Sequence, residues 1–181
     1  MKKKILWITR TAILLALLVT LQALTKGFGQ LVTGSCVNAV LAVSVLVGGL
    51  GCGLTVAVIS PVLAFLLGIA PQPLTVPVIM VGNCVYVLVL HCLAGKDGCK
   101  LPRQIAAWLC AALAKFALLY AAVGWLICGV FAQPLLESGL LKQPMLQALP
   151  ATFSWPQLVT ALIGGAAALL TVPVLRKTLN R

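Results

Sequence analysis

The chain has 181 residues, of which 62% are hydrophobic and only 8% are charged, and its formal net charge is +11. Soluble domains carry about 25% charged residues, so this composition excludes an ordinary soluble domain. The apolar stretches also lack the alternation of polar and apolar residues, in units of about ten, that marks a transmembrane β-barrel. We therefore predict an all-α integral membrane protein that lies in a lipid bilayer.

The first apolar segment, residues 5–25, follows a basic N-terminus and ends at Lys26. A helix needs about 20 residues to cross the hydrocarbon layer, and this segment is long enough. A basic start is also typical of a signal peptide, but no small-x-small cleavage site follows it. We expect a transmembrane helix that is retained in the protein.

The second apolar stretch, residues 36–70, is too long for one span, because a single helix of that length would measure about 50 Å. The sequence GGLGCG at its centre, residues 48–53, is typical of a turn. We therefore predict a helical hairpin in this stretch, with one span on each side of the glycines.

Three further apolar stretches, which we predict as the fourth, fifth and sixth spans, follow the hairpin. A basic loop, GKDGCKLPR, divides the fourth span from the fifth, and a mildly polar stretch with several prolines, residues 131–156, precedes the sixth. Within that stretch we expect a short interfacial helix over residues 135–141. The predicted spans of this single six-helix domain, residues 1–181, are 5–25, 35–50, 52–67, 75–94, 104–130 and 155–175.

The basic residues predict the orientation of these spans. Most of the 13 lysines and arginines lie at the N-terminus, in the loop at residues 95–104 or at the C-terminus, and six spans place all three clusters on one side. Cytoplasmic loops of membrane proteins are enriched in lysine and arginine, so we expect both termini in the cytoplasm. The same clustering explains the net charge without a nucleic-acid partner.

Catalytic and metal-binding patterns are absent from the sequence. The only acids, Asp97 and Glu137, lie outside the predicted spans, which argues against ion-coupled carriers and against enzymes with paired acids. His91 is expected at the membrane interface, and the seven cysteines do not have the spacing of a zinc site. Neither a Walker A loop nor a G-x-S-x-G elbow is present. We expect no enzymatic activity, no cofactor and no metal.

Three polar side chains, Asn38, Asn83 and Lys115, lie inside apolar spans and have two interpretations. In the first, the amides bond helix to helix and the lysine snorkels to the interface. In the second, all three face an outward-open cavity and hold a small polar solute, with aromatic side chains packed on it. An ammonium without an acid partner is costly in a membrane, and a carboxylate on the solute would offset that cost. The candidate substrate-binding residues are Asn38, Asn83, Lys115, Tyr86, Gln30 and Trp125.

The first span carries Ala12 and Ala16, one helical turn apart and directly after Arg10. Small residues at this spacing let a second helix approach closely. The partner helix is either part of the same bundle or part of another protein.

Taken together, these features resemble the substrate-binding (S) component of energy-coupling factor (ECF) transporters, which import vitamins into bacteria. The resemblance rests on the length, the six spans, the basic N-terminus before Ala-x-x-x-Ala, and stretches such as VTGSCVNAV and VPVIMVGNCVYVLV. It implies a protein of the bacterial cytoplasmic membrane that binds a vitamin-like solute in its outer half, under loops at residues 26–34 and 69–75. It also implies docking through Ala12 and Ala16 onto a transmembrane coupling protein that two cytoplasmic ATPases drive.

The alternatives are another small carrier or channel, and a membrane scaffold that transports nothing. A channel needs polar residues along the full length of several spans, whereas here they concentrate in the outer half. A scaffold needs no pocket. A cavity that reaches Asn38, Asn83 or Lys115 would favour solute binding, and tight packing around the asparagines would favour a scaffold.

Overall fold

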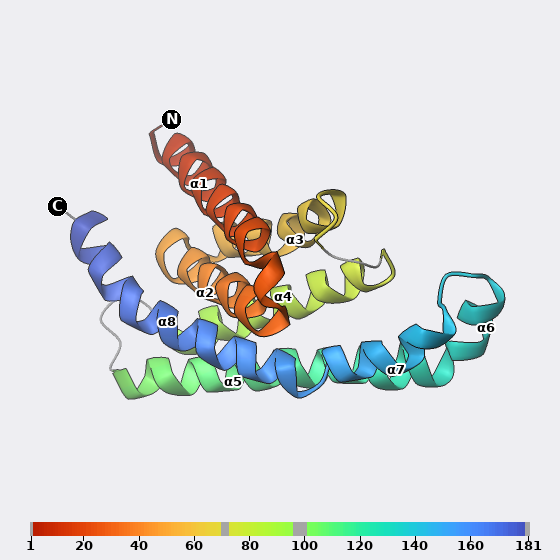
Figure 1. Ribbon diagram of the computed structural model, residues 1–181. Coiled ribbons are helices and arrows are strands. Elements are labelled where there is room, and N and C mark those ends of the chain that lie inside the picture. The colour runs from red at the N-terminus through yellow and green to blue at the C-terminus, as the bar shows by residue number, and fades with distance from the viewer. Residues whose placement is uncertain (1, 70–72, 96–100, 180–181) are drawn as a thin grey trace.

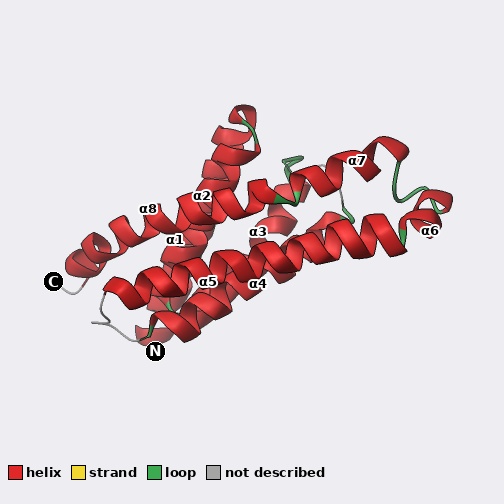
Figure 2. Cartoon of the chain, turned by 90° about the horizontal axis from the view of Figure 1, so that it is seen from below, coloured by secondary structure: helices red, strands yellow, loops and turns green. Residues whose placement is uncertain are grey.

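A computed structural model describes residues 2–69, 73–95 and 101–179. Every regular element in these ranges is a helix, which confirms the predicted all-α class (Figures 1 and 2). The elements are α1 (Lys2–Thr25), the 3-10 helix η1 (Lys26–Phe28), α2 (Gln30–Gly48), α3 (Leu50–Leu66), α4 (Thr75–Ala94), α5 (Leu101–Tyr120), the π-helix η2 (Ala121–Val130), α6 (Ala132–Glu137), α7 (Gln143–Thr152) and α8 (Trp155–Leu179).

Five helical stretches in the described ranges are long and apolar enough to cross a membrane. The helix α3, with 17 residues, is apolar but shorter. These lengths fit a multi-pass membrane protein, while the number of spans and the side on which the termini lie stay predictions. The five stretches are Lys4–Phe28, Gln30–Gly48, Thr75–Ala94, Leu101–Val130 and Gln143–Thr178.

The predicted hairpin is present, and its turn is a single residue between α2 and α3. Gly49 has a φ of 84°, a conformation that a side chain would strain, and its N–H donates to the carbonyl oxygen of Val45 at 3.1 Å. A glycine at the end of a helix satisfies a carbonyl that the helix leaves open and reverses the chain. The fourth predicted span coincides with α4.

The prediction of one interfacial helix over residues 135–141 was wrong, because two helices, α6 and α7, lie between η2 and α8. The helix α6 ends before Gly139, whose φ of 74° takes the chain out of the helical conformation. The helix α7 begins at Gln143, with Pro144 in its first turn, a position where the missing N–H costs nothing. Both boundaries therefore follow from one glycine and one proline.

The bundle depends on close backbone contact between α2 and α8. A Cβ on Gly164 would lie 2.5 Å from the carbonyl oxygen of Ser35 and 2.7 Å from the backbone nitrogen of Ala39. Real Cβ atoms do not approach backbone so closely, so only glycine fits there. Small residues at such contacts are typical of helix packing in membranes.

Both termini lie at the same end of the molecule as the start of α5 (Figures 1 and 2). At this end two arginines bind the open carbonyls of helix C-termini. Arg103 Nε donates to the carbonyl oxygen of Leu93 in α4 at 2.9 Å, and Arg176 Nη2 donates to that of Leu46 in α2 at 2.6 Å. These contacts satisfy orphan carbonyls and place positive charge at the negative ends of two helix dipoles.

At the other end, α5 continues into η2, and the pair extends past the bundle alongside α7 (Figure 1). The N–H of Phe131 donates to the carbonyl oxygen of Leu126 at 2.9 Å, the five-residue step of a π-helix. A second apolar cluster holds α7 against this extension, and it thereby fixes one wall of the cavity described below. Its buried members are Leu119, Val123, Ile127, Leu141, Leu149 and Phe153.

A substitution at Gly165 tests the packing of α5 against α8. A Cβ at this position would overlap the indole of Trp108, whose Nε1 donates to the carbonyl oxygen of Ala161 at 3.2 Å. We predict that Gly165→Ala lowers the thermal unfolding midpoint in detergent, since overpacking a core costs about 1–3 kcal/mol. Gly27→Ala is the matched control, because a Cβ there meets nothing within 4 Å. Equal midpoints for the two variants would contradict the close contact.

Candidate functional site

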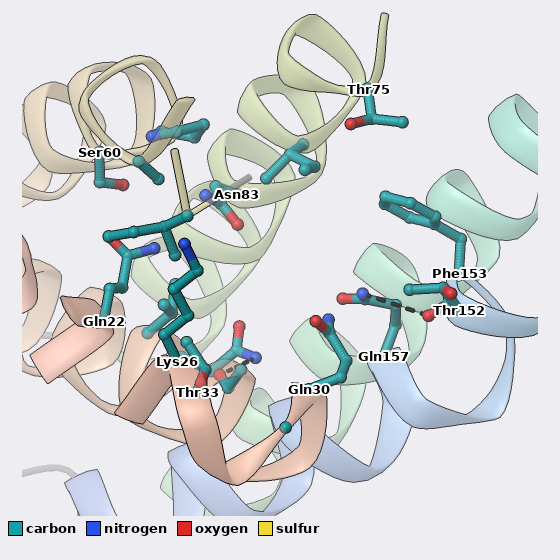
Figure 3. A pocket seen from close by; sticks show the side chains of 18 of the residues that line it. Gln22, Lys26, Gln30, Thr33, Ser60, Thr75, Asn83, Thr152, Phe153 and Gln157 are labelled. Carbon is teal, nitrogen blue, oxygen red and sulfur yellow. Dashed lines mark hydrogen bonds between the residues drawn. The ribbon is translucent and has the colours of Figure 1, made fainter. Parts of the chain in front are cut away.

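A cavity of about 440 Å³ lies at the end of the bundle away from the termini, within the size range typical of small-molecule sites (Figure 3). The end of α1, the starts of α2, α4 and α8, and parts of α3, α5 and α7 contribute to its walls. Its lining residues are Gln22, Lys26, Gly29, Gln30, Thr33, Gly34, Val37, Asn38, Ser60, Pro61, Ala64, Ile69, Thr75, Ile79, Asn83, Lys115, Met145, Ala148, Leu149, Thr152, Phe153 and Gln157.

The buried end of the cavity holds the ammonium of Lys115 between two amides. Lys115 Nζ donates to Asn38 Oδ1 at 2.7 Å and to Asn83 Oδ1 at 2.8 Å. The lysine is 3% exposed and both asparagines are 1% exposed. Sequence reasoning selected these three residues separately, and the structure joins them into one group that connects α2, α4 and α5.

The ring of Tyr86 lies beside this ammonium, with Lys115 Nζ 5.6 Å from the ring centroid. This distance is within the range of a cation–π interaction, which strengthens where water is excluded. Tyr86 is fully buried and does not line the cavity. The structure therefore places it next to the lysine and not on the wall of the cavity.

The ammonium also sets the orientation of both amides. Because an ammonium has donors only, each asparagine turns its oxygen towards Lys115 and its NH₂ group away. Asn38 Nδ2 then donates to the carbonyl oxygen of Gly34 at 2.9 Å and to Thr160 Oγ1 at 3.3 Å, which adds α8 to the group. Asn83 Nδ2, in contrast, is buried and has no hydrogen-bond partner among the residues that the structure describes.

Three cavity residues carry buried polar atoms that have no partner in the described structure: Gln22 Oε1, Ser60 Oγ and Asn83 Nδ2. A buried polar atom left unpaired costs about 1–3 kcal/mol, so such atoms are rare in folded proteins. Gln22, Ser60 and Asn83 come from α1, α3 and α4, and Figure 3 shows them grouped around one part of the cavity. They offer a bound molecule one acceptor, one hydroxyl and one NH₂ donor.

The mouth of the cavity lies where exposed residues line it, at Lys26, Gly29, Gln30 and Ala148. Lys26 Nζ donates to the carbonyl oxygen of Gly68 at 2.6 Å, which links the end of α1 to the end of α3. The predicted candidate Gln30 thus lies at the entrance and not at the buried end.

The two loops expected to cover the site border the cavity as far as they are described. Lys26, Gly29 and Thr33 from the first loop line it, as do Ile69 and Thr75 from the second. Residues 70–72 of the second loop lie outside the described residues.

The remaining predicted residues lie away from the cavity. Trp125 is 69% exposed on η2 and does not line it. Ala12 and Ala16 are exposed on α1. Sequence reasoning did not select Gln22 or Ser60 for the site, although a polar side chain within an apolar segment was a usable signal for both.

The charge of the cavity is positive, because Lys26 and Lys115 line it and none of the described lining residues is acidic. The described acid Glu137 lies in α6 and is not a lining residue. Within the described ranges, no group of three His, Cys, Asp or Glu side chains is arranged to hold a metal ion. The site is therefore suited to bind a molecule that brings negative charge and hydrogen-bond acceptors.

Comparisons with family models, with curated proteins and with solved structures gave no match to this chain.

A pair of substitutions tests the ammonium–amide group. We predict that Asn83→Leu lowers the thermal midpoint, since it leaves a buried charge with one acceptor fewer. Adding Lys115→Met should recover part of this loss, because the apolar side chain removes the charge that needed the acceptor. A double variant less stable than Asn83→Leu alone would contradict the interaction.

Proposed function

We propose that this protein is the substrate-binding (S) component of an ECF-type importer, which captures a small vitamin-like solute outside the cell. The observation that carries the proposal is the cavity that reaches Asn38, Asn83 and Lys115 together. A scaffold would fill that space with side chains. Here the amides bond the lysine and still leave about 440 Å³ beside them.

The residues on the far side of Lys115 favour a carrier over a channel. One or two turns towards the end with the termini, the same helices present buried apolar side chains, among them Val45, Leu90 and Ala111. A water-filled pathway through the bundle would need polar residues at this level. The buried hydroxyl of Ser44 at this level is bonded to the carbonyl oxygen of Leu41 in its own helix, and none of the residues at this level lines the cavity, as in a site that is open on one side.

The distribution of charge supports the orientation that this function needs. The termini and the start of α5 lie at one end, and the cavity opens at the other (Figures 1 and 2). If the basic clusters are cytoplasmic, the cavity faces the outside of the cell. Six spans require α3 to cross with 17 residues, the lower limit for a transmembrane helix.

The exposed face of α1 supports docking on a partner in the membrane. The helix α1 packs mainly against α2 and α3, and Ile5, Ile13 and Leu17 are exposed on its other side, near Ala12 and Ala16. Two exposed alanines one turn apart allow the close approach of a helix from another protein. That protein would be the coupling protein, and its two ATPases would supply the energy.

Affinity purification from native membranes tests this docking. We predict that the tagged protein co-purifies with a multi-pass membrane protein and two ATPases, and that Ala12→Leu or Ala16→Leu removes them because leucine prevents close approach. Ala167→Leu, at an exposed alanine of α8, is the matched control and should retain the partners. The thermal midpoint of the purified chain should be equal in all three variants.

Two outcomes would contradict the proposal. One is a preparation that is free of ATPases in every variant. The other is partner loss that is the same for Ala167→Leu as for the α1 variants, since this would show that the contact does not depend on α1.

A further inference from the structure

We infer that the solute is a small organic anion with one carboxylate, which binds at Lys115 and Asn83, and an apolar body with a hydrogen-bond donor. This inference rests on the proposed function of the same cavity and defines the chemical class of its ligand. Nothing in it depends on which coupling protein the chain uses.

The first argument concerns charge. Lys115 is buried, and its described partners, two amide oxygens and an aromatic ring, are all neutral. Dipoles of this kind offset only part of the cost of removing an ammonium from water, whereas an opposite charge in the same low-dielectric surroundings offsets far more. Since no described lining residue is acidic, the opposite charge must arrive with the ligand.

The second argument concerns the donors at the buried end. Lys115 uses two of its three N–H groups on the asparagines, and the third has no hydrogen-bond acceptor among the described residues. The NH₂ of Asn83 has no partner and belongs to the same amide whose oxygen lies 2.8 Å from Lys115 Nζ. The remaining N–H of Lys115 and the NH₂ of Asn83 are therefore two donors separated by a single amide group. A carboxylate, which has two oxygens and accepts charge-assisted hydrogen bonds, satisfies both at once.

The third argument concerns the rest of the cavity. Away from Lys115, most of the wall is apolar, with Val37, Ile79, Leu149 and Phe153 among its residues. Such a wall suits an apolar body and disfavours a highly charged one such as a nucleotide. Gln22 Oε1 is a buried acceptor that has no partner among the described residues, so an N–H or O–H group on the body would satisfy it.

Thermal stabilisation of the purified full-length chain by matched acids and amides tests the inference. The probes are 4-hydroxybenzoate, 4-hydroxyphenylacetate, 4-(4-hydroxyphenyl)butyrate and 8-hydroxyoctanoate, which each carry one hydroxyl donor on the body, and each is compared with its own primary amide at the same pH and ionic strength. We expect at least one acid to raise the unfolding midpoint and to bind about tenfold more tightly than its amide. The comparison needs no variant, so it stands even if a substitution at the site impairs folding.

Substitutions then test whether Lys115 causes the preference for the acid over its amide. Lys115→Met should make acid and amide equal, whereas Lys142→Met, which changes an exposed lysine outside the cavity, should keep the preference. Lys26→Gln should weaken acid binding less than Lys115→Met, because Lys26 is exposed and already donates to Gly68.

The inference is overturned if no acid in the panel stabilises the protein, if the amides bind as well as the acids, or if the preference survives Lys115→Met. These failures are distinct from failure of the proposed function. If the solute is neutral and its uptake still depends on Ala12 and Ala16, the inferred carboxylate is refuted while the proposed importer function stands. If the chain binds acids but recruits no ATPase, the importer function is refuted while the inferred carboxylate stands.

Discussion

The structure is organised around one buried ammonium that has no described acid beside it. Lys115 lies in the middle of a long apolar helix, and a charge in that position must be solvated by the protein. Asn38 and Asn83 solvate the ammonium because both amide oxygens accept hydrogen bonds from it. The NH₂ group of Asn38 in turn donates to Thr160 Oγ1. One hydrogen-bonded group thereby links α2, α4, α5 and α8.

The cavity follows from the same requirement. Once both amide oxygens are committed to Lys115, the NH₂ of Asn83 has no hydrogen-bond partner among the described residues, and it lies buried in the cavity wall, as do the unpartnered atoms of Gln22 and Ser60. Towards the termini the helices close on apolar side chains, and at the opposite end α7 is held in place by its own apolar cluster. The three residues with unpartnered polar atoms therefore line one cavity, within reach of a molecule of limited size.

The helices and the individual polar residues could be predicted from the sequence, whereas the contacts among those residues could not. The glycines at residues 48–53 indicated the hairpin because a turn at Gly49 needs a positive φ. Lys115 and the asparagines were recognisable as polar groups within apolar spans. Their mutual bonding depends on how three helices are rotated about their axes, which no local pattern encodes. Trp125 was expected at the site as an aromatic side chain that packs on the solute, but it lies in the π-helix and is exposed.

The central claim is that this cavity holds a solute, and the most direct test is mass spectrometry of the small molecules that the protein retains through purification. Unmodified protein should be compared with Ala148→Trp, which fills the mouth of the cavity, and with Ala117→Trp, which places the same side chain on an exposed face of α5. The account predicts a small molecule in near-stoichiometric amount in the unmodified protein and in Ala117→Trp, and its loss from Ala148→Trp. The same molecules in equal amounts from all three proteins would contradict it.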